Sequence, residues 1–252
     1  MTRERPKRIV SLCPSLTELA FQLGAGESLV AVTKFCVEPA ERVRNLPVVG
    51  GTKDPKLEAI CELAPDLVLM NEEENRVEDA DSLRAAGLDV WTSFPKTLDD
   101  SADLIRELGE RLGRAQLAEV SADRVEQAVA TARERALGLE RVPFVCLIWR
   151  KPWMALGAST YGSSLLEAVG GKNLLGGDTG YPVLEPEDLA VHGPARVILP
   201  DEPFPFREKH VQELMEASGL AREVWKLCDG RPLFWHGSQT IQGLELAARC
   251  LG

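Results

Sequence analysis

The chain has 252 residues, of which 44% are hydrophobic and 27% charged, as in soluble globular proteins. Its net charge of −10 argues against nucleic acid as a partner, because binding phosphates requires a basic surface. The N-terminal MTRERPKRIV contains no apolar signal core, and no stretch is long enough to insert into a bilayer, so the chain as it stands is expected to be cytoplasmic. A chain from which an export signal has been removed would read the same, and its location would then be periplasmic or membrane-anchored.

Short apolar segments alternate with helical patterns in the first part of the chain. Strands are expected at residues 8–12, 29–32, 67–70 and 89–92. Helices are expected from a capping-box pattern at 15–18, and at 57–63, 76–86 and 98–112. This alternation predicts βαβ units and a mainly parallel sheet.

Residues 114–137 form one long helical pattern without glycine or proline. Its apolar residues recur at alternating spacings of four and three, which places them on one helical face: Ala118, Ala122, Val125, Val129, Ala132 and Ala136. At about 1.5 Å per residue, such a helix spans roughly 36 Å, the diameter of a small domain. It therefore suggests a rod that joins two lobes with a ligand held in the cleft between them. An ordinary amphipathic helix within one large domain is the alternative.

The remaining residues repeat the strand and helix alternation. Strands are expected at residues 142–149, 153–156, 197–199 and 233–235, and helices at 163–169, 184–191, 208–217 and 238–251. We therefore predict an α/β protein of two Rossmann-like lobes with mainly parallel sheets, joined by a single long helix. The predicted boundaries are an N-terminal lobe at 1–113, the connecting helix at 114–140 and a C-terminal lobe at 141–252.

The six cysteines include no CxxC or other close pair. Cys61, Cys146 and Cys250 lie in apolar contexts, where a cysteine is usually a small buried hydrophobe. No disulfide framework is expected, and reduced thiols fit a cytosolic protein.

Four segments carry a resemblance to a known family: RIVSLCPSLTELAFQLG at 8–24, LEAICELAPDLVLM at 57–70, LRAAGLDVW at 83–91 and SLLEAVGGKNLL at 164–175. With them the chain resembles substrate-binding proteins of the vitamin B12, siderophore and haem type, also described as helical-backbone metal receptors, and most of all their cobalamin-binding branch. The resemblance implies non-covalent capture of a corrinoid or another metal chelate in an interlobe cleft, for an ABC-type importer. It implies no covalent cofactor; cobalamin or an iron chelate would be the ligand.

Ligands of parallel α/β sheets bind beyond the carboxyl ends of the strands, and that rule nominates loops. In the first lobe the candidates are Ser11, Cys13, Pro14, Ser15, Lys34, Phe35, Gly51, Lys53, Asn71 and Trp91. In the second lobe they are Trp149, Arg150, Trp153, Tyr161, Tyr181, Glu202, Phe204, Trp235 and His236. Tryptophans suit the broad apolar face of a corrin or porphyrin, although Trp149 and Trp235 could instead fill the lobe cores.

Two of these candidates have a specific chemical role. Arg150 is the cation best placed to meet carboxylates, amides or phosphate of the ligand. His236 is a candidate axial metal ligand through its neutral imidazole; the alternative is a hydrogen-bonded residue at a helix start. A metal site of Cys13, Cys36 and His236 is a further alternative.

Catalysis is not indicated, because the chain lacks the GxSxG, GxxxxGK[ST], GxGxxG and HExxH patterns. If the protein serves an importer, acidic residues on the rim of each lobe are expected to dock the permease: Glu74, Glu78, Glu202 and Glu208. The protein is expected to be a monomer without nucleic acid and without membrane insertion. The alternative function is a cytosolic protein of the same fold that handles a cofactor or metal, as a sensor or an enzyme.

Overall fold

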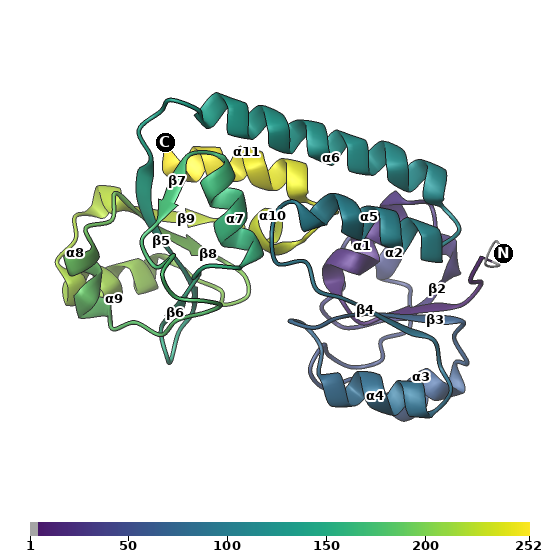
Figure 1. The fold of residues 1–252 in the computed structure, drawn as a ribbon. Helices are drawn as coiled ribbons and strands as arrows, with labels where there is room; N and C mark the ends of the chain where they lie inside the picture. The colour runs from purple at the N-terminus through teal and green to yellow at the C-terminus, as the bar shows by residue number, and fades with distance from the viewer. Residues whose placement is uncertain (1–4) are drawn as a thin grey trace. The chain divides into compact units, whose positions relative to one another are not determined.

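A computed structural model describes residues 5–252 and divides the chain into two compact units. Unit 1 comprises the residues up to Pro95 and Ser101–Arg124, and unit 2 comprises Lys96–Asp100 and Val125–Gly252. Each unit is built on its own sheet, so that the predicted α/β class with two sheets is confirmed (Figure 1). The division of the chain at 113 and 140 stays a prediction.

Unit 1 contains a parallel sheet of four strands in the order β2-β1-β3-β4. The strands are β1 (Ile9–Ser11), β2 (Leu29–Val32), β3 (Leu67–Asn71) and β4 (Val90–Ser93). All five residues of β3 are buried, because helices cover both faces of the sheet. The predicted strands of this half are thus confirmed, with ends that differ by at most one residue.

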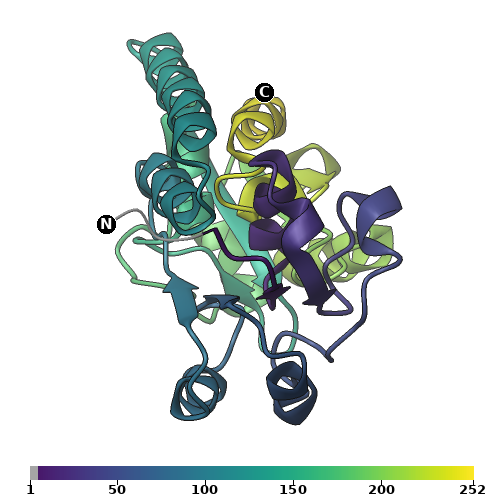
Figure 2. The same ribbon diagram turned by 90° about the vertical axis from the view of Figure 1, so that its right-hand side faces the viewer.

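The helices of unit 1 form two layers around this sheet. They are α1 (Pro14–Gln22), α2 (Ala40–Val43), α3 (Leu57–Glu62), α4 (Val77–Ala85) and α5 (Asp100–Arg111). Helices α3 and α4 lie on one face, and α1 and α5 lie on the other (Figures 1 and 2). Ile60 of α3 and Leu83 of α4 pack on Val10, Val68 and neighbouring side chains to form one core cluster.

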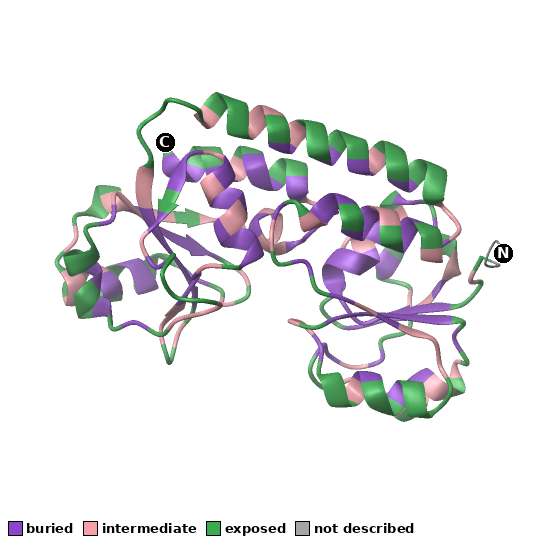
Figure 3. Cartoon of the chain, viewed as in Figure 1, coloured by how far each residue is buried: buried purple, intermediate pink, exposed green. Residues whose placement is uncertain are grey.

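Helix α6 (Ala115–Ala136) passes from unit 1 into unit 2. Its predicted apolar face is confirmed, because Ala118, Ala122, Val125 and Val129 are buried while the remaining faces are mostly exposed (Figure 3). Within unit 1, a Cβ added at Gly109 of α5 would collide with the Cβ of Ala118, which shows how closely the two helices approach. No helix within residues 5–252 combines the length and apolar character needed to cross a bilayer.

Unit 2 contains a sheet in the order β6-β5-β8-β9, with β7 also paired to β5. The strands are β5 (Val142–Trp149), β6 (Met154–Ala155), β7 (Gly171–Asn173), β8 (Arg196–Pro200) and β9 (Trp225–Cys228). Only β6 is antiparallel among these strands. The sheet is therefore mainly parallel, as predicted.

Helices cover both faces of the second sheet as well. They are α7 (Tyr161–Ala168), α8 (Leu189–His192), α9 (Glu208–Ser218), α10 (Arg231–Phe234) and α11 (Thr240–Leu251). Leu189 of α8 and Leu214 of α9 pack with Val145 and Val197 in one core cluster. Helices α7 and α11 lie beside each other on the other face (Figure 1).

The local structure differs from the predictions at three places. Helix α1 begins at Pro14 with Cys13 as N-cap, so that Ser15 lies inside the helix, and the capping box expected at 15–18 is absent. The strand expected at 233–235 is absent, since Leu233 and Phe234 belong to the helical turn α10, which has Pro232 in its first turn. The last strand is β9, which was not predicted.

Candidate ligand-binding edges

The four strands of unit 1 all end at one edge of the sheet, so the loops that follow them lie together. Asn75 joins three of these loops. Its side-chain amide donates to the carbonyls of Leu12 and Thr52, each at 3.0 Å, and its Oδ1 accepts the N–H of Asn71 at 2.8 Å. Only 4% of Asn75 is exposed, so its buried side chain holds the three loops together. The sequence analysis named Asn71 but not Asn75.

Asn71 shapes the loop after β3 and does not present its side chain to solvent. Its amide nitrogen donates to the Ser93 carbonyl at 3.1 Å, and its Oδ1 accepts the N–H groups of Glu73 and Glu74 at 3.0 and 3.2 Å. The amide nitrogen and the amide oxygen of Asn71 therefore both have hydrogen-bond partners within the protein. The prediction that Asn71 contacts a ligand directly has no support in this arrangement.

The candidates after β1 are buried beneath the edge. The Thr17 hydroxyl lies 2.8 Å from the Ser11 Oγ and 3.1 Å from the Cys36 Sγ, and the Cys13 Sγ lies 3.3 Å from the Ser15 Oγ. Burial raises the pKa of the Cys13 thiol to about 12, and burial also raises the pKa of Cys36. Both thiols are thus protonated at neutral pH and form part of a polar layer under the loops, together with Pro14 at the first position of α1.

The exposed part of this edge carries apolar and basic side chains. Phe35 is 50% exposed, with the Lys34 Nζ 5.1 Å from its ring centre. Lys53 donates to the carbonyl of Glu73 at 2.6 Å and so anchors one loop on another. A Cβ at Gly51 would meet only the carboxylate of the exposed Asp54 and the Lys34 side chain, both of which can move aside. The exposed apolar residues Val37 and Val48 were not predicted, since isolated valines in loops carry no signal in the sequence.

Trp91 is placed differently from its prediction. It lies within β4, not in the loop that follows, and it is buried. The guanidinium of Arg111 stacks on its indole ring at 5.6 Å. Trp91 is therefore a packing residue of unit 1.

In unit 2 an aromatic cluster forms from the end of β5, the loops after β5 and β8, and the start of α9: Trp149, Trp153, Phe204, Phe206 and His210. Trp149 meets Phe204 edge-on at 5.8 Å, and Trp153 stacks on Phe206 at 6.2 Å. His210 lies against both phenylalanine rings, at 5.2 and 5.8 Å. Burial lowers the pKa of His210, which favours its neutral form.

Trp149 remains 42% exposed, so the cluster presents an indole to solvent at the carboxyl edge of the sheet. The alternative that Trp149 fills the core is therefore wrong. Arg150 holds this surface in place, because its guanidinium bonds both oxygens of Glu213 at 2.7 and 3.1 Å and lies 5.6 Å from the Trp153 ring. The same hydrogen bonds lower the pKa of Glu213.

Three other candidates of unit 2 lie inside it. Trp235 and His236 follow the short helix α10, not a strand, and both are buried. Trp235 donates to Glu202 at 3.2 Å, and the buried Tyr161 hydroxyl lies 2.9 Å from the Thr240 Oγ1. For Trp235, the alternative of a core residue is thus confirmed.

His236 packs its ring edge-on against Tyr161 at 4.9 Å. Burial lowers its pKa to about 4. Within residues 5–252, no group of three or more His, Cys, Asp or Glu side chains is arranged to hold a metal ion. The alternative site of Cys13, Cys36 and His236 draws on both units and stays a prediction. Ligation of a chelated metal by His236 alone stays a prediction.

The acidic residues predicted to dock a permease differ in exposure. Glu78 is exposed beside Arg76 at 3.7 Å, and Glu208 is paired with Arg222 at 3.1 Å. Glu74 and Glu202 are only partly exposed, and burial raises the pKa of both carboxyl groups. Tyr181 is partly exposed in the loop before α8.

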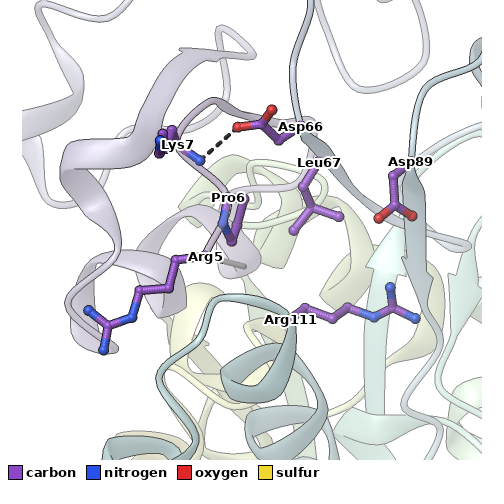
Figure 4. Close-up of a pocket in the computed structure, with 7 residues that line it drawn as sticks. All are labelled: Arg5, Pro6, Lys7, Asp66, Leu67, Asp89 and Arg111. Carbon is purple, nitrogen blue, oxygen red and sulfur yellow. Dashed lines mark hydrogen bonds between the residues drawn. The ribbon is translucent and has the colours of Figure 1, made fainter. Parts of the chain in front are cut away.

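Unit 1 has a pocket of about 250 Å³ at its opposite edge. Its walls come from residues that precede β1, β3 and β4 and from the end of α5: Arg5, Pro6, Lys7, Asp66, Leu67, Asp89 and Arg111. Figure 4 shows acidic and basic side chains on its walls, and the Asp66 carboxylate accepts the N–H of Lys7 at 2.7 Å. This pocket lies at the amino ends of the strands and is separate from the predicted ligand loops.

Comparison with known families and sequences gives a consistent result. The sequence model of a family described as periplasmic binding protein matches residues 9–222. The vitamin B12-binding protein of Vibrio campbellii is 26% identical over 189 residues, covering 75% of this chain and 68% of that protein. The vitamin B12-binding protein of Photorhabdus laumondii is 26% identical over 195 residues, covering 77% and 70%.

Solved structures share the fold over almost the entire chain. The periplasmic haem-binding protein RhuT from Roseiflexus, in its apo form, has a TM-score of 0.84 and 28% identity, with 98% of this chain and 99% of that chain covered. The periplasmic vitamin B12 binding protein of Vibrio cholerae has a TM-score of 0.82 and 23% identity, with 98% and 96% covered.

Proposed function

This chain belongs to the periplasmic binding protein family, and we propose that it captures a corrinoid such as cobalamin, or another metal chelate such as haem, without a covalent bond. The observation that carries the proposal is the likeness, over three quarters of the chain, to proteins named for vitamin B12 binding. The likeness to a haem-binding protein at 28% identity keeps a porphyrin within the same class of ligand.

The aromatic cluster of unit 2 supports a flat, mostly apolar ligand. An exposed indole can cover the face of a macrocycle, and Trp149 is held at the edge by the ring of Phe204. Arg150 fixes the adjacent Trp153 through Glu213, so little side-chain freedom is lost when a ligand binds. We assign Arg150 this positioning role ahead of a direct contact with a ligand carboxylate.

Exposed groups of unit 1 offer contacts of the same chemical kinds. Phe35 offers a second apolar surface, and the ammonium groups of Lys34 and Lys53 suit the carboxylates, amides or phosphate on the rim of such a ligand. The buried Ser11, Cys13 and Ser15 are left to support these loops. We further propose delivery to an ABC-type importer, with the exposed Glu78 and Glu208 as docking residues on the two units.

The test is equilibrium dialysis of the purified chain against cyanocobalamin and, separately, haemin. We expect saturable binding of one of them, weakened about 10-fold or more in Trp149→Ala, because an aromatic anchor contributes roughly 1.5–3 kcal/mol. Trp225→Phe is the matched control, since Trp225 is buried in β9 and should leave the affinity unchanged. Absence of saturable binding to both ligands would reject the proposal.

A further inference from the structure

His210 joins the aromatic cluster of unit 2 to the start of helix α9. It is the third residue of α9, and its Nδ1 accepts the backbone N–H of Arg207 at 3.0 Å. A backbone N–H can only donate, so Nδ1 carries no proton and the neutral ring holds its proton on Nε2. Glutamate or glutamine is the usual acceptor at this position of a helix. In this protein the acceptor is instead a group whose ordinary pKa lies near neutral pH.

The ring of His210 packs inside the cluster. It is 6% exposed and lies against the rings of Phe204 and Phe206. Phe204 meets Trp149 edge-on, and Phe206 stacks on Trp153. Only one phenylalanine therefore separates the imidazole from each of the two indoles, and a displacement of His210 reaches both.

The charged side chains around His210 disfavour a positive imidazole. Four of them act on the ring: Arg207, Lys209 and Glu213 of α9 and its N-cap, and Arg150 of the loop after β5. Three of the four are cations, and the one carboxylate already bonds Arg150 through both oxygens. The turn at Pro186–Asp188 also packs on α9, but within residues 5–252 its Glu187 and Asp188 make no hydrogen bond or ion pair with His210. Burial first, and then the cations, lower the pKa of His210.

Protonation of His210 acts on two contacts that fix the cluster. Nδ1 becomes a donor and can no longer accept the N–H of Arg207, which then loses its partner. The imidazolium also competes with Arg150 for the carboxylate of Glu213. Arg150 is the cation that lies over the ring of Trp153, so a change in its ion pair frees that indole.

We propose that His210 is the positioning residue of the aromatic cluster and that its protonation in acid releases Trp149 and Trp153 from their present arrangement. The consequence is an affinity for the ligand that is highest where the imidazole is neutral. This consequence rests on the proposed function, whereas the movement of the two tryptophans does not. The pKa of His210 is lowered from 6.5, so the cluster is intact at neutral pH and is released as the pH falls below that value.

The experiment is a pH titration of the full chain labelled with 5-fluorotryptophan, followed by fluorine NMR from about pH 8 to about pH 5. The chain has five tryptophans, and single Trp→Phe replacements assign their resonances. We expect the resonances of Trp149 and Trp153 to shift together along one curve with its midpoint below pH 6.5. The resonance of Trp91, which is buried in unit 1, should stay constant.

His210→Gln is the deciding variant, because glutamine keeps an acceptor for the N–H of Arg207 and does not titrate. After far-ultraviolet circular dichroism has established that the variant is folded, its Trp149 and Trp153 resonances should no longer depend on pH. His192→Gln is the matched control at an exposed histidine of α8 and should titrate as the wild type does.

Equilibrium dialysis against cyanocobalamin and, separately, haemin measures the consequence for binding. Between about pH 7.5 and about pH 5.5, the affinity of the wild type for the ligand that it binds should fall about 10-fold, as for the loss of an aromatic anchor. In His210→Gln it should stay within about twofold over the same range. If neither ligand binds, the proposed function fails, while the fluorine titration still decides whether His210 positions the cluster.

Nitrogen NMR of the wild-type imidazoles provides a test that needs no folded His210→Gln variant. His210 should appear as the Nε2–H tautomer at neutral pH and should titrate with the same midpoint as the two tryptophans. The proposal is overturned if the Trp149 and Trp153 resonances do not move, if they move equally in His210→Gln, or if His210 titrates with a different midpoint.

Discussion

Replacing Asn75 by alanine is expected to lower the free energy of unfolding by about 3 kcal/mol, a large effect for one uncharged side chain. The amide of Asn75 satisfies the carbonyls of Leu12 and Thr52, and its oxygen satisfies the N–H of Asn71. Alanine fills none of these positions. Three buried backbone groups would lose their partners, each at a cost of roughly 1–3 kcal/mol before relaxation or water entry.

Urea unfolding followed by far-ultraviolet circular dichroism measures this change. Asn45→Ala is the matched control, because Asn45 is exposed in the turn after α2 and its loss should change stability by less than about 0.5 kcal/mol. A loss below about 1 kcal/mol in Asn75→Ala would show that water replaces the side chain and that Asn75 does not organise the edge. Asn75→Asp tests the same point, since its carboxylate retains the acceptor but removes both donated bonds.

Elements with a strong period could be predicted from the sequence because one local pattern decides them. The face of α6 and the apolar runs of β3 and β5 follow from spacing alone, and their burial agrees with it. Elements with a weak local pattern could not be predicted, because they form only by pairing with segments far along the chain. Strand β9 carries Lys226 within four residues, and it became a strand through pairing with β8.

In the candidate site, too, local sequence predicts some features and tertiary packing decides the others. The rule that ligands bind beyond strand ends selected the loops containing Phe35 and Trp149, and both are exposed there. It could not separate them from Trp235 and His236, whose burial depends on how α10 and α11 pack. Exposure of an aromatic residue is a property of tertiary packing, and no local pattern encodes it.

The burial of His236 leads to a second large effect, on the pH dependence of stability. Burial lowers its pKa from 6.5 to about 4 in the folded protein. Between these values the unfolded chain takes up a proton at this imidazole and the folded protein does not, so unfolding is favoured as the pH falls. The contribution is therefore present in full above pH 6.5 and is lost as the pH falls toward 4, with a total of about 3 kcal/mol.

His236→Gln is expected to remove this dependence, because glutamine does not titrate. The free energy of unfolding should fall between pH 7 and pH 4.5 by about 2–3 kcal/mol more in the wild type than in the variant. His192→Gln, at an exposed histidine of α8, is the control and should follow the wild type.

Two partly buried carboxyl groups also affect the pH dependence of stability. Glu74 and Glu202 have raised pKa values in the folded protein, so their contribution to stability increases on acidification, opposite to that of His236. They remain in both proteins, so subtracting the variant's pH dependence from that of the wild type isolates His236. Parallel curves for wild type and His236→Gln would mean that this imidazole has the same pKa in the folded protein as in the unfolded chain, so that burial would not keep it neutral at acidic pH.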